Sequence, residues 1–293
     1  MIALTDTTDV PARVVVFGAP GLIGHALVDL LEAAKIPVVP LGSSDIDLCS
    51  ERAADQAAEA MLPGDTLVML SALTPDKGRD TATFVRNVKM ADAVCRAMAV
   101  KPPAHVVYMS SDAVYPMTPG LIHEATPTGA TDLYGAMHMA RERMFESVCG
   151  DTPLAITRCS QVAATHDTHN SYGPNRFRRQ ALAEGKIILG GNGEETRDHV
   201  WVDDVARLLS TIIARRGDGV INLASGVSHS FRDVAEMVAD NLADRPEIVT
   251  TERNNPITHR HFDVTVLNEV LPDFRFTPLP EIVASIHAAL DIK

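Results

Sequence analysis

A glycine triplet near the N-terminus, Gly18-x-x-Gly21-x-x-Gly24, constrains the fold of this chain more than any other feature. It follows the apolar run Val14–Phe17, which is typical of a strand buried on both faces. A helical pattern comes next, with apolar residues three or four positions apart at Leu22, Ala26, Leu30 and Ala33. Glycine permits positive φ at a tight turn and lets the backbone approach a pyrophosphate. This order predicts a dinucleotide site, and an ordinary glycine turn is the alternative.

Strands and helices are expected to alternate over the first half of the chain. Short apolar runs predict strands at Pro37–Leu41, Thr66–Leu70, His105–Met109 and Leu154–Thr157. Helical patterns lie between them, for example at Ala53–Met61 and Thr83–Met98. This alternation predicts an α/β fold, namely a Rossmann-type doubly wound parallel sheet with right-handed crossovers.

The sequence changes in character after Arg158, where polar loops separate shorter elements. Predicted helices there are Arg176–Glu184, Asp203–Arg215, Phe231–Leu242 and Pro280–Asp291. Predicted strands are Ile187–Leu189, His199–Val202 and Val220–Leu223. We therefore expect residues 11–160 to form mainly the dinucleotide-binding domain. Residues 161–293 are expected to form mainly a smaller substrate-binding region, with some segments returning to the Rossmann sheet.

Composition and charge argue against several classes of partner. The 293 residues carry a formal net charge of −12 and only 4% aromatic side chains, which disfavours surfaces that bind nucleic acid or anionic lipid. No apolar run reaches the ~20 residues needed to span a bilayer, and no signal peptide is evident. The four cysteines stand far apart, and His166, His169 and Asn170 lack a carboxylate at metal-ligand spacing. We expect a cytoplasmic protein without a bound metal.

Polar side chains with catalytic potential follow the predicted strand His105–Met109. Ser110 and Ser111 stand at its carboxyl end, the edge at which open parallel sheets bind ligands. Tyr134 and His138 lie four residues apart, leading into a helical segment. Residues at this spacing share one helix face, so both side chains are predicted to face the same cleft.

The residues after the second predicted strand bear on which dinucleotide binds. A ribose-binding carboxylate is expected ~20 residues after the glycine turn. Ser43 and Ser44 occupy that place, and Asp45 and Asp47 come slightly later. Small hydroxyl groups suit a 2′-phosphate, although no arginine is present to pair with its charge. Either NAD or NADP fits, with a slight preference for NADP; Asp45 and Asp47 alternatively cap the next helix or lie in solvent.

Four motifs in this order resemble the extended short-chain dehydrogenases/reductases, specifically the NAD-dependent epimerase/dehydratase family. They are the glycine triplet, the run Ser110-Ser-x-x-x-Tyr115, the pair Tyr134-x-x-x-His138 and the segment Gly190–Ala206. The resemblance extends over nearly the whole chain. It implies that Ser111 hydrogen-bonds the reacting oxygen of a sugar, that Tyr134 transfers the proton and that a nicotinamide transfers hydride.

The chain departs from this family at His138, where the family has a lysine. The resemblance implies that such a lysine lowers the pKa of the tyrosine and holds the nicotinamide ribose. Histidine has a reference pKa of ~6.5, so it is largely uncharged at neutral pH unless a bound phosphate or Asp132 raises it. Three interpretations remain: a working enzyme that tolerates histidine, a slow enzyme with an unusual pH optimum, and an inactive nucleotide-binding sensor or scaffold.

The resemblance also implies the remaining site residues. The expected cofactor contacts are Gly18, Gly21, Leu22, Ile23, Gly24, Ser43, Asp47, Leu48, Ser71, Ala72, Asn87, Ser110, Tyr134 and His138. The expected substrate contacts are Ser111, Asp112, Asn175, Arg197 and Arg260, with the two arginines on a nucleoside diphosphate or else in surface ion pairs. Asn87 is expected to support the backbone of the active-site helix. Tyr115 is expected to wall the cleft and Tyr108 to lie in the core.

The activity implied is 4-epimerisation or 4-keto reduction of a nucleoside-diphosphate sugar. Asp112 beside Ser111 leaves dehydration open, since family dehydratases carry an added acid near the serine or the tyrosine. An excess of three positive charges between Pro174 and Lys186 suits a small anionic ligand despite the negative net charge. A homodimer is expected through the helix Leu133–Val148, whose apolar residues include Met137, Met144 and Phe145.

Overall fold

A six-stranded parallel sheet forms the centre of the computed structural model, which describes residues 1–6, 10–117, 120–167 and 173–291. The strand order is β10-β6-β4-β3-β1-β2, and every neighbouring pair is parallel. The strands are β1 (Val14–Phe17), β2 (Val38–Leu41), β3 (Thr66–Met69), β4 (His105–Ser111), β6 (Leu154–Cys159) and β10 (Gly219–Leu223). The direction of winding reverses between β1 and β3. A doubly wound sheet binds its ligand at this switch point, outside the carboxyl ends of the strands.

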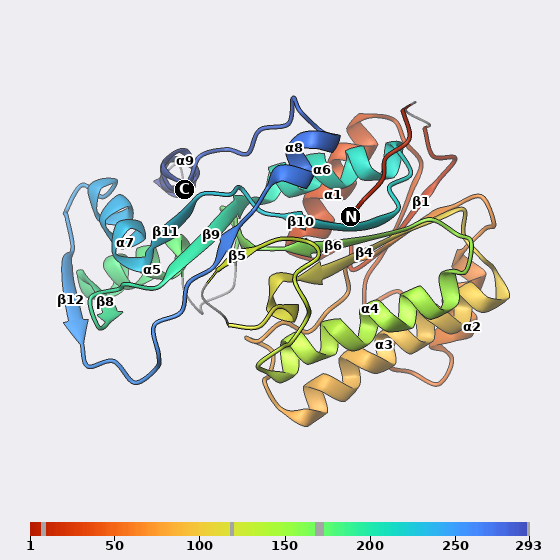
Figure 1. Cartoon of the computed structure of the whole chain (residues 1–293), viewed down its shortest axis with the longest axis horizontal. Helices are drawn as coiled ribbons and strands as arrows, with labels where there is room; N and C mark the ends of the chain where they lie inside the picture. Colours follow the sequence, from red (N-terminus) through yellow and green to blue (C-terminus); the bar gives the residue numbers. More distant parts are fainter. Residues whose placement is uncertain (7–9, 118–119, 168–172, 292–293) are drawn as a thin grey trace.

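Helices cover both faces of this sheet (Figure 1). One face is covered by α1 (Leu22–Ala33) and α6 (Val202–Ala214), and the other by α2 (Ala53–Ala60), α3 (Thr81–Val100) and α4 (Leu133–Cys149). Successive side chains of β1 point to opposite faces: Val14 and Val16 join the core under α1 and α6, while Val15 and Phe17 join the core under the other helices. Burial on both faces explains the continuous apolar run of β1.

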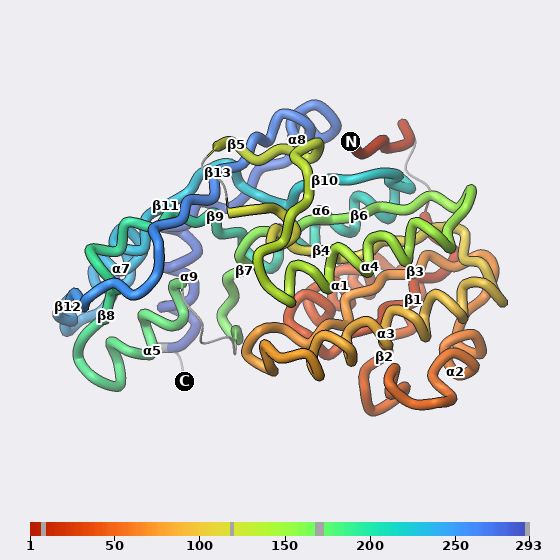
Figure 2. The backbone as a smooth tube through the Cα atoms, turned by 60° about the horizontal axis from the view of Figure 1, so that its bottom comes forward, coloured from red at the N-terminus to blue at the C-terminus, as the bar shows by residue number. Residues whose placement is uncertain are grey.

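The smaller region lies at the opposite end of the molecule from α2 and has its own apolar core (Figure 2). Its strands are β7 (Gln161–Ala163), β8 (Lys186–Gly190), β9 (Thr196–Trp201), β11 (Ser228–Ser230) and β12 (Glu247–Thr251). Its helices are α5 (Pro174–Glu184), α7 (Phe231–Asp240) and α9 (Leu279–Asp291). The strand pair β5 (Leu121–Ile122) and β13 (His261–Phe262) and the helix α8 (Thr265–Val270) connect this region with the large sheet.

The predicted Rossmann-type sheet is confirmed, and two elements of the second half join it. Strand β10 forms its edge beside β6, and α6 packs against α1. Strand β9 ends one residue before the predicted end, because Val202 begins α6. The helix with the catalytic candidates begins at Leu133, where the Asp132 side chain accepts a hydrogen bond from the Gly135 N–H at 2.8 Å.

Among the described residues, no helix is long and apolar enough to cross a bilayer. Nor does the described part of the chain hold three His, Cys, Asp or Glu side chains grouped for a metal ion. His169 and Asn170, considered above as metal ligands, lie outside the described residues.

Candidate active site

The turn after β1 requires glycine at two positions. Gly18 has a φ of +94°, and a Cβ atom there would lie 2.7 Å from the backbone nitrogen of Ser71, which follows β3. A Cβ atom on Gly24 would lie 2.3 Å from the carbonyl oxygen of Gly18. Both distances are shorter than real Cβ contacts, so the first turn of α1 packs directly against this loop.

The start of α1 offers hydrogen-bond donors to an anion. Gly21 is the N-cap residue without a side-chain cap, and the first turn has no acidic residue. The first intrahelical bond runs from the His25 N–H to the Gly21 carbonyl, so the N–H groups of Leu22, Ile23 and Gly24 precede it. These donors and the positive end of the helix dipole fit a pyrophosphate.

The loop after β2 places two of the predicted cofactor residues at the surface. Ser43 and Asp47 are exposed, and Asp47 accepts a hydrogen bond from the Cys49 N–H at 2.9 Å. The Asp45 carboxylate accepts one from the Gly42 N–H at 2.8 Å, so it stabilises the end of the strand. The Leu48 side chain is buried in the core under α2 and α3, which leaves its backbone as the part that can face a cofactor.

The loop after β3 holds Ser71 and Ala72 beside the glycine turn. Asn87 of α3 fixes this loop through two hydrogen bonds with Leu73, since its Oδ1 accepts from the Leu73 N–H at 2.8 Å and its Nδ2 donates to the Leu73 carbonyl at 3.0 Å. These bonds therefore support the loop after β3, here called the cofactor loop because Ser71 and Ala72 are predicted cofactor contacts. The resemblance implied instead that Asn87 supports the backbone of α4.

Ser111 and Tyr134 meet at the carboxyl end of β4. A Cβ atom on Gly135 would lie 2.1 Å from the Ala113 carbonyl oxygen, so the start of α4 sits against the turn η1 (Asp112–Val114). This contact brings α4, and with it Tyr134, to the end of β4 where Ser111 lies. Burial, together with Tyr108 and Asp112, raises the pKa of Tyr134 above its usual range, and the nearby Ser111 hydroxyl opposes this rise.

His138 points into the protein and contacts two tyrosines. Its Nδ1 lies 2.6 Å from the Tyr108 hydroxyl, and its ring meets the Tyr134 ring edge to face with centroids 4.7 Å apart. Burial, and secondarily the charge of Arg141, lowers the pKa of His138 well below its usual range. The imidazole is therefore neutral at physiological pH. Asp132 does not raise its pKa, because that carboxylate caps α4.

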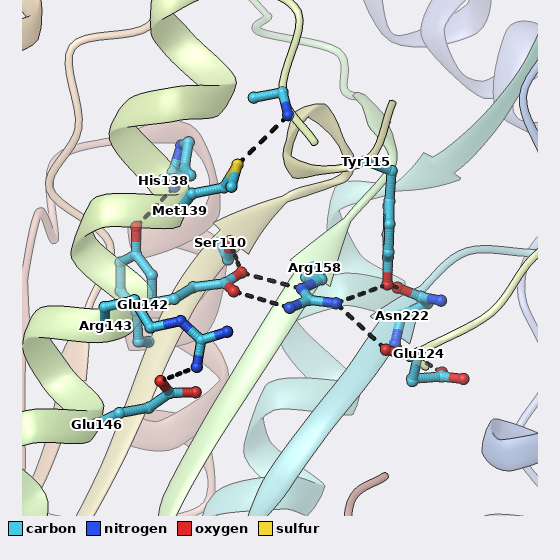
Figure 3. Close-up of polar contacts among 12 residues, drawn as sticks. Ser110, Tyr115, Glu124, His138, Met139, Glu142, Arg143, Glu146, Arg158 and Asn222 are labelled. Atoms are coloured by element: carbon cyan, nitrogen blue, oxygen red, sulfur yellow. Dashed lines mark hydrogen bonds and ion pairs between the residues drawn. The ribbon is translucent and has the colours of Figure 1, made fainter. Parts of the chain in front are cut away.

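A buried polar network lies beside the catalytic candidates (Figure 3). Glu142 of α4 accepts hydrogen bonds from both Ser110, at 2.6 Å, and Arg158 of β6, at 3.0 Å and 2.8 Å. Arg158 also donates to the Tyr115 hydroxyl at 3.0 Å. Tyr115 is fully buried, so the expectation that it walls the cleft is wrong, because its hydroxyl is needed as a partner inside the core. Tyr108 is fully buried, as expected.

The charges of both candidate phosphate-binding arginines, Arg260 and Arg197, act on Asp112. Arg260 is buried, and its guanidinium contacts the Tyr115 carbonyl at 3.2 Å and the Asp112 carboxylate at 3.8 Å. Arg197 donates to the Thr258 carbonyl at 2.8 Å and lies over the Phe231 ring. Burial raises the pKa of Asp112, while the charges of Arg260 and Arg197 oppose this rise.

Asn175 lies near the start of α5 and is buried. Its Nδ2 donates to the Ala164 carbonyl, and its Oδ1 has no hydrogen-bond partner among the described residues. The Asn175 amide therefore fixes the chain after β7 and retains one free acceptor.

Sequence reasoning missed Tyr108, Arg141 and Glu142 as neighbours of the site. Arg141 follows Tyr134 by seven residues and Glu142 follows His138 by four, so helical spacing alone places both residues on the inner part of α4. The same helix buries Met137 and Phe145 in the core, so these two do not form the apolar docking face expected for a dimer.

Comparisons with known proteins agree with this arrangement. The sequence model of the NAD dependent epimerase/dehydratase family matches residues 14–224. A curated relative, dTDP-L-rhamnose 4-epimerase of Burkholderia thailandensis, is 28% identical over 172 residues, which are 53% of this chain. The matched part is 44% of that relative, so the chain matches less than half of the relative's length.

Solved structures share the whole fold. MoeE5 in complex with UDP-glucuronic acid and NAD superimposes with a TM-score of 0.83 and 25% identity over 96% of this chain and 100% of that chain. A GDP-L-fucose synthetase from Naegleria fowleri has a TM-score of 0.83 at 16% identity over 100% of this chain and 97% of that chain, and therefore shows the fold alone. From the family match and the whole-chain fold, we conclude that the chain belongs to the NAD-dependent epimerase/dehydratase family.

Proposed function

We propose that the chain is an NAD(P)-dependent 4-epimerase of a nucleoside-diphosphate sugar. The observation that carries this proposal is the packing of the start of α4, with Tyr134, against the turn after Ser111 at the carboxyl end of β4, at the same sheet edge as the glycine turn. The names of two relatives support the substrate class, since one is a dTDP-L-rhamnose 4-epimerase and another was solved with UDP-glucuronic acid.

In the proposed mechanism, Tyr134 removes the proton of the sugar C4 hydroxyl while Ser111 holds that oxygen by a hydrogen bond. A nicotinamide held at the glycine turn would supply a reversible hydride acceptor for C4, so that inversion there needs no added reductant. Tyr134 gives its proton back to the same oxygen, so protons balance over one cycle.

Arg197 and Arg260 are the proposed holders of the substrate diphosphate. A guanidinium presents a planar fork of donors that can bind phosphate oxygens in pairs. Arg260 stands 3.8 Å from the Asp112 carboxylate beside Ser111, so a diphosphate here would lie close to the reacting sugar. Asn175, with its free acceptor, is proposed to contact the sugar or the first phosphate.

The cofactor proposal rests on the glycine turn, with the adenosine ribose near Ser43. Exposed hydroxyl groups at Ser43 and Ser44 favour NADP, whereas the Asp45 carboxylate fixed at Gly42 would oppose a 2′-phosphate. Isothermal titration with both cofactors decides between them. We expect binding of both, with the tighter one at least tenfold stronger.

A dehydratase is the second candidate, and one observation favours it. Asp112 adjoins Ser111, and its burial raises its pKa, so this carboxyl is suited to protonate a leaving hydroxyl. An inactive sensor or scaffold, suggested by His138, is the third candidate. We also propose a homodimer. The outer face of α4, the helix expected at its interface, carries charged residues such as Arg143 and Glu146.

Incubation with UDP-, dTDP- and GDP-hexoses and NAD(P)+ separates these candidates. Proton NMR should show inversion at C4 without any added reductant. Loss of water from the sugar, seen by mass spectrometry, would instead identify a dehydratase. Turnover only of a 4-keto sugar with NAD(P)H would identify a reductase. Cofactor binding without turnover of any sugar would support the sensor, and absence of cofactor binding at millimolar concentration would refute all four.

A further inference from the structure

Arg141 is a buried cation whose presence the proposed mechanism does not yet explain. Its side chain is completely buried on the inner side of α4. The adjacent carboxylate, Glu142, is paired with Arg158 instead, and Arg141 forms no ion pair in the described part of the chain. A buried charge without a counter-charge destabilises the folded state. A residue of this kind therefore calls for a functional reason.

The contacts of Arg141 connect the catalytic helix to the cofactor loop. Its Nη2 donates to the Ser71 carbonyl at 2.8 Å, and its Nη1 lies 3.8 Å from the Met137 sulfur. The guanidinium carbon lies 5.2 Å from the centroid of the Tyr108 ring, a cation–π distance. Its Nε has no hydrogen-bond partner among the described residues.

Tyr108 and His138 lie between this cation and the catalytic phenol. The Tyr108 hydroxyl is 2.6 Å from His138 Nδ1, and the His138 ring packs edge to face against Tyr134. Tyr134, His138 and Arg141 follow one another at spacings of four and three, so they occupy one face of α4. The cluster therefore consists of two phenols, a neutral imidazole and one permanent positive charge.

The other charged or titratable groups around the cluster do not supply a cation. Asp112, after β4, raises the pKa of Tyr134, while Arg141 lowers it. Cys95 on α3 has its pKa raised by burial to about 12, so it stays a neutral thiol. Glu142 is neutralised by Arg158. Arg197 and Arg260 act on Asp112, on the substrate side of the site.

We propose that Arg141 is a positioning residue that supplies the fixed positive charge behind Tyr134 and ties that charge to the cofactor loop at Ser71. The proposal rests on the role of Tyr134 in the proposed function. Arginine suits this position because its guanidinium stays charged when buried, whereas a buried lysine loses its proton readily. His138 then serves as a neutral spacer between the two phenols.

The pH dependence of kcat tests this role in Arg141→Met, with Arg143→Met as the matched control. Arg143 lies on the same helix, but its side chain is 72% exposed and pairs with Glu146. We expect the acidic limb of the Arg141→Met profile to move up by about one pH unit, with about tenfold lower kcat at neutral pH and little change in KM. The Arg143→Met profile should match the wild type.

A charge relocation gives the second arm of the test. The double variant His138→Lys with Arg141→Met moves the cation to position 138 and should return the acidic limb to the wild-type pH. An Arg141→Met profile with an unchanged midpoint, or a shifted midpoint that the double variant does not restore, overturns the proposal. Arg141→Gln, which is neutral but keeps a donor for Ser71, replaces Arg141→Met if the latter does not fold.

A third arm does not need turnover, so it separates this proposal from the proposed function. The chain has four tyrosines, and fluorotyrosine labelling with Tyr134→Phe for assignment allows fluorine NMR to follow ionisation at position 134. Ionisation should require higher pH in Arg141→Met than in the wild type. If no sugar is turned over but this shift occurs, the proposed function fails while the charge role stands. If ionisation is unchanged, the charge role fails.

Discussion

At the scale of single residues, two adjacent serines at the end of β4 have different surroundings. The Ser110 side chain is buried and donates to Glu142 at 2.6 Å, so it belongs to the network that links β4, α4 and β6. The Ser111 side chain is partly exposed, accepts a hydrogen bond from the Ala113 N–H at 3.2 Å and lies near Tyr134. Alternation along the strand explains this difference, because neighbouring side chains point to opposite faces. We assign the contact with the reacting oxygen to Ser111 alone.

Removal of each hydroxyl should therefore have a different effect. Ser111→Ala should lower kcat by about 10²-fold with a native melting temperature, because a donor to the reacting oxygen acts in the transition state. Ser110→Ala should leave kcat within about threefold and lower the free energy of unfolding by about 1–3 kcal/mol, because Glu142 loses a buried partner. Steady-state kinetics and urea denaturation measure both effects. Equal losses of kcat in the two variants would contradict the assignment.

At the scale of elements, the connection from β1 to α1 positions the cofactor donors. Gly18 and Gly24 lie so close to neighbouring backbone that no Cβ atom fits, and this closeness brings α1 against the loop after β3. The N-terminal donors of α1 thereby face the sheet edge that carries Ser111. If these donors hold the pyrophosphate as proposed, a change in the geometry of the turn also changes the affinity for the cofactor.

Gly24→Ala should weaken cofactor binding at least tenfold and lower the melting temperature, because the new methyl group would lie 2.3 Å from the Gly18 carbonyl oxygen. Gly64→Ala is the matched control, since a Cβ atom at Gly64 would meet nothing within 4 Å. Isothermal titration calorimetry of NAD(P)+ with both variants tests this. Wild-type affinity in Gly24→Ala would show that the turn does not hold the cofactor.

The sequence predicted the elements whose patterns are local and strong. Apolar runs placed β1, β3, β4 and β6, and the spacing of Tyr134 and His138 placed both on one helix face. It did not predict short strands such as β11, which is entirely polar, and β12, which has only two adjacent apolar residues and so no alternation. Nor did it predict the burial of Tyr115, because that follows from Arg158 and Asn222, which are distant in the sequence.

At the scale of the whole molecule, buried histidines couple stability to pH. His105 is fully buried, and burial lowers its pKa from 6.5 to about 4. The unfolded chain therefore binds a proton near pH 6.5 that the folded protein binds only near pH 4. The stability contributed by neutral His105 is complete above the unfolded pKa and is lost as the pH falls toward the folded pKa.

His105→Gln isolates this contribution, because glutamine can donate to the Gly217 carbonyl, which now lies 2.9 Å from His105 Nε2, and does not titrate. The free energy of unfolding of the wild type, relative to this variant, should fall by about 3 kcal/mol between pH 7 and pH 4. Urea denaturation at several pH values measures the difference. Burial raises the pKa values of Asp112 and Asp198, and this opposes the loss of stability at low pH. Both proteins carry these aspartates, so their effect cancels in the difference. A difference that does not vary with pH would show that His105 titrates normally in the folded state.

The central claim is that Tyr134 moves the proton in a reaction of a nicotinamide cofactor with a sugar, and the rate of C4 inversion by Tyr134→Phe tests it most directly. Phenylalanine keeps the ring against His138 and removes only the hydroxyl, so cofactor affinity should stay within about twofold while kcat falls by about 10²- to 10⁴-fold. Tyr115→Phe loses a hydroxyl that bonds Arg158 and Asn222 inside the core, so this variant should retain kcat and lose stability. An undiminished rate in Tyr134→Phe would contradict the account.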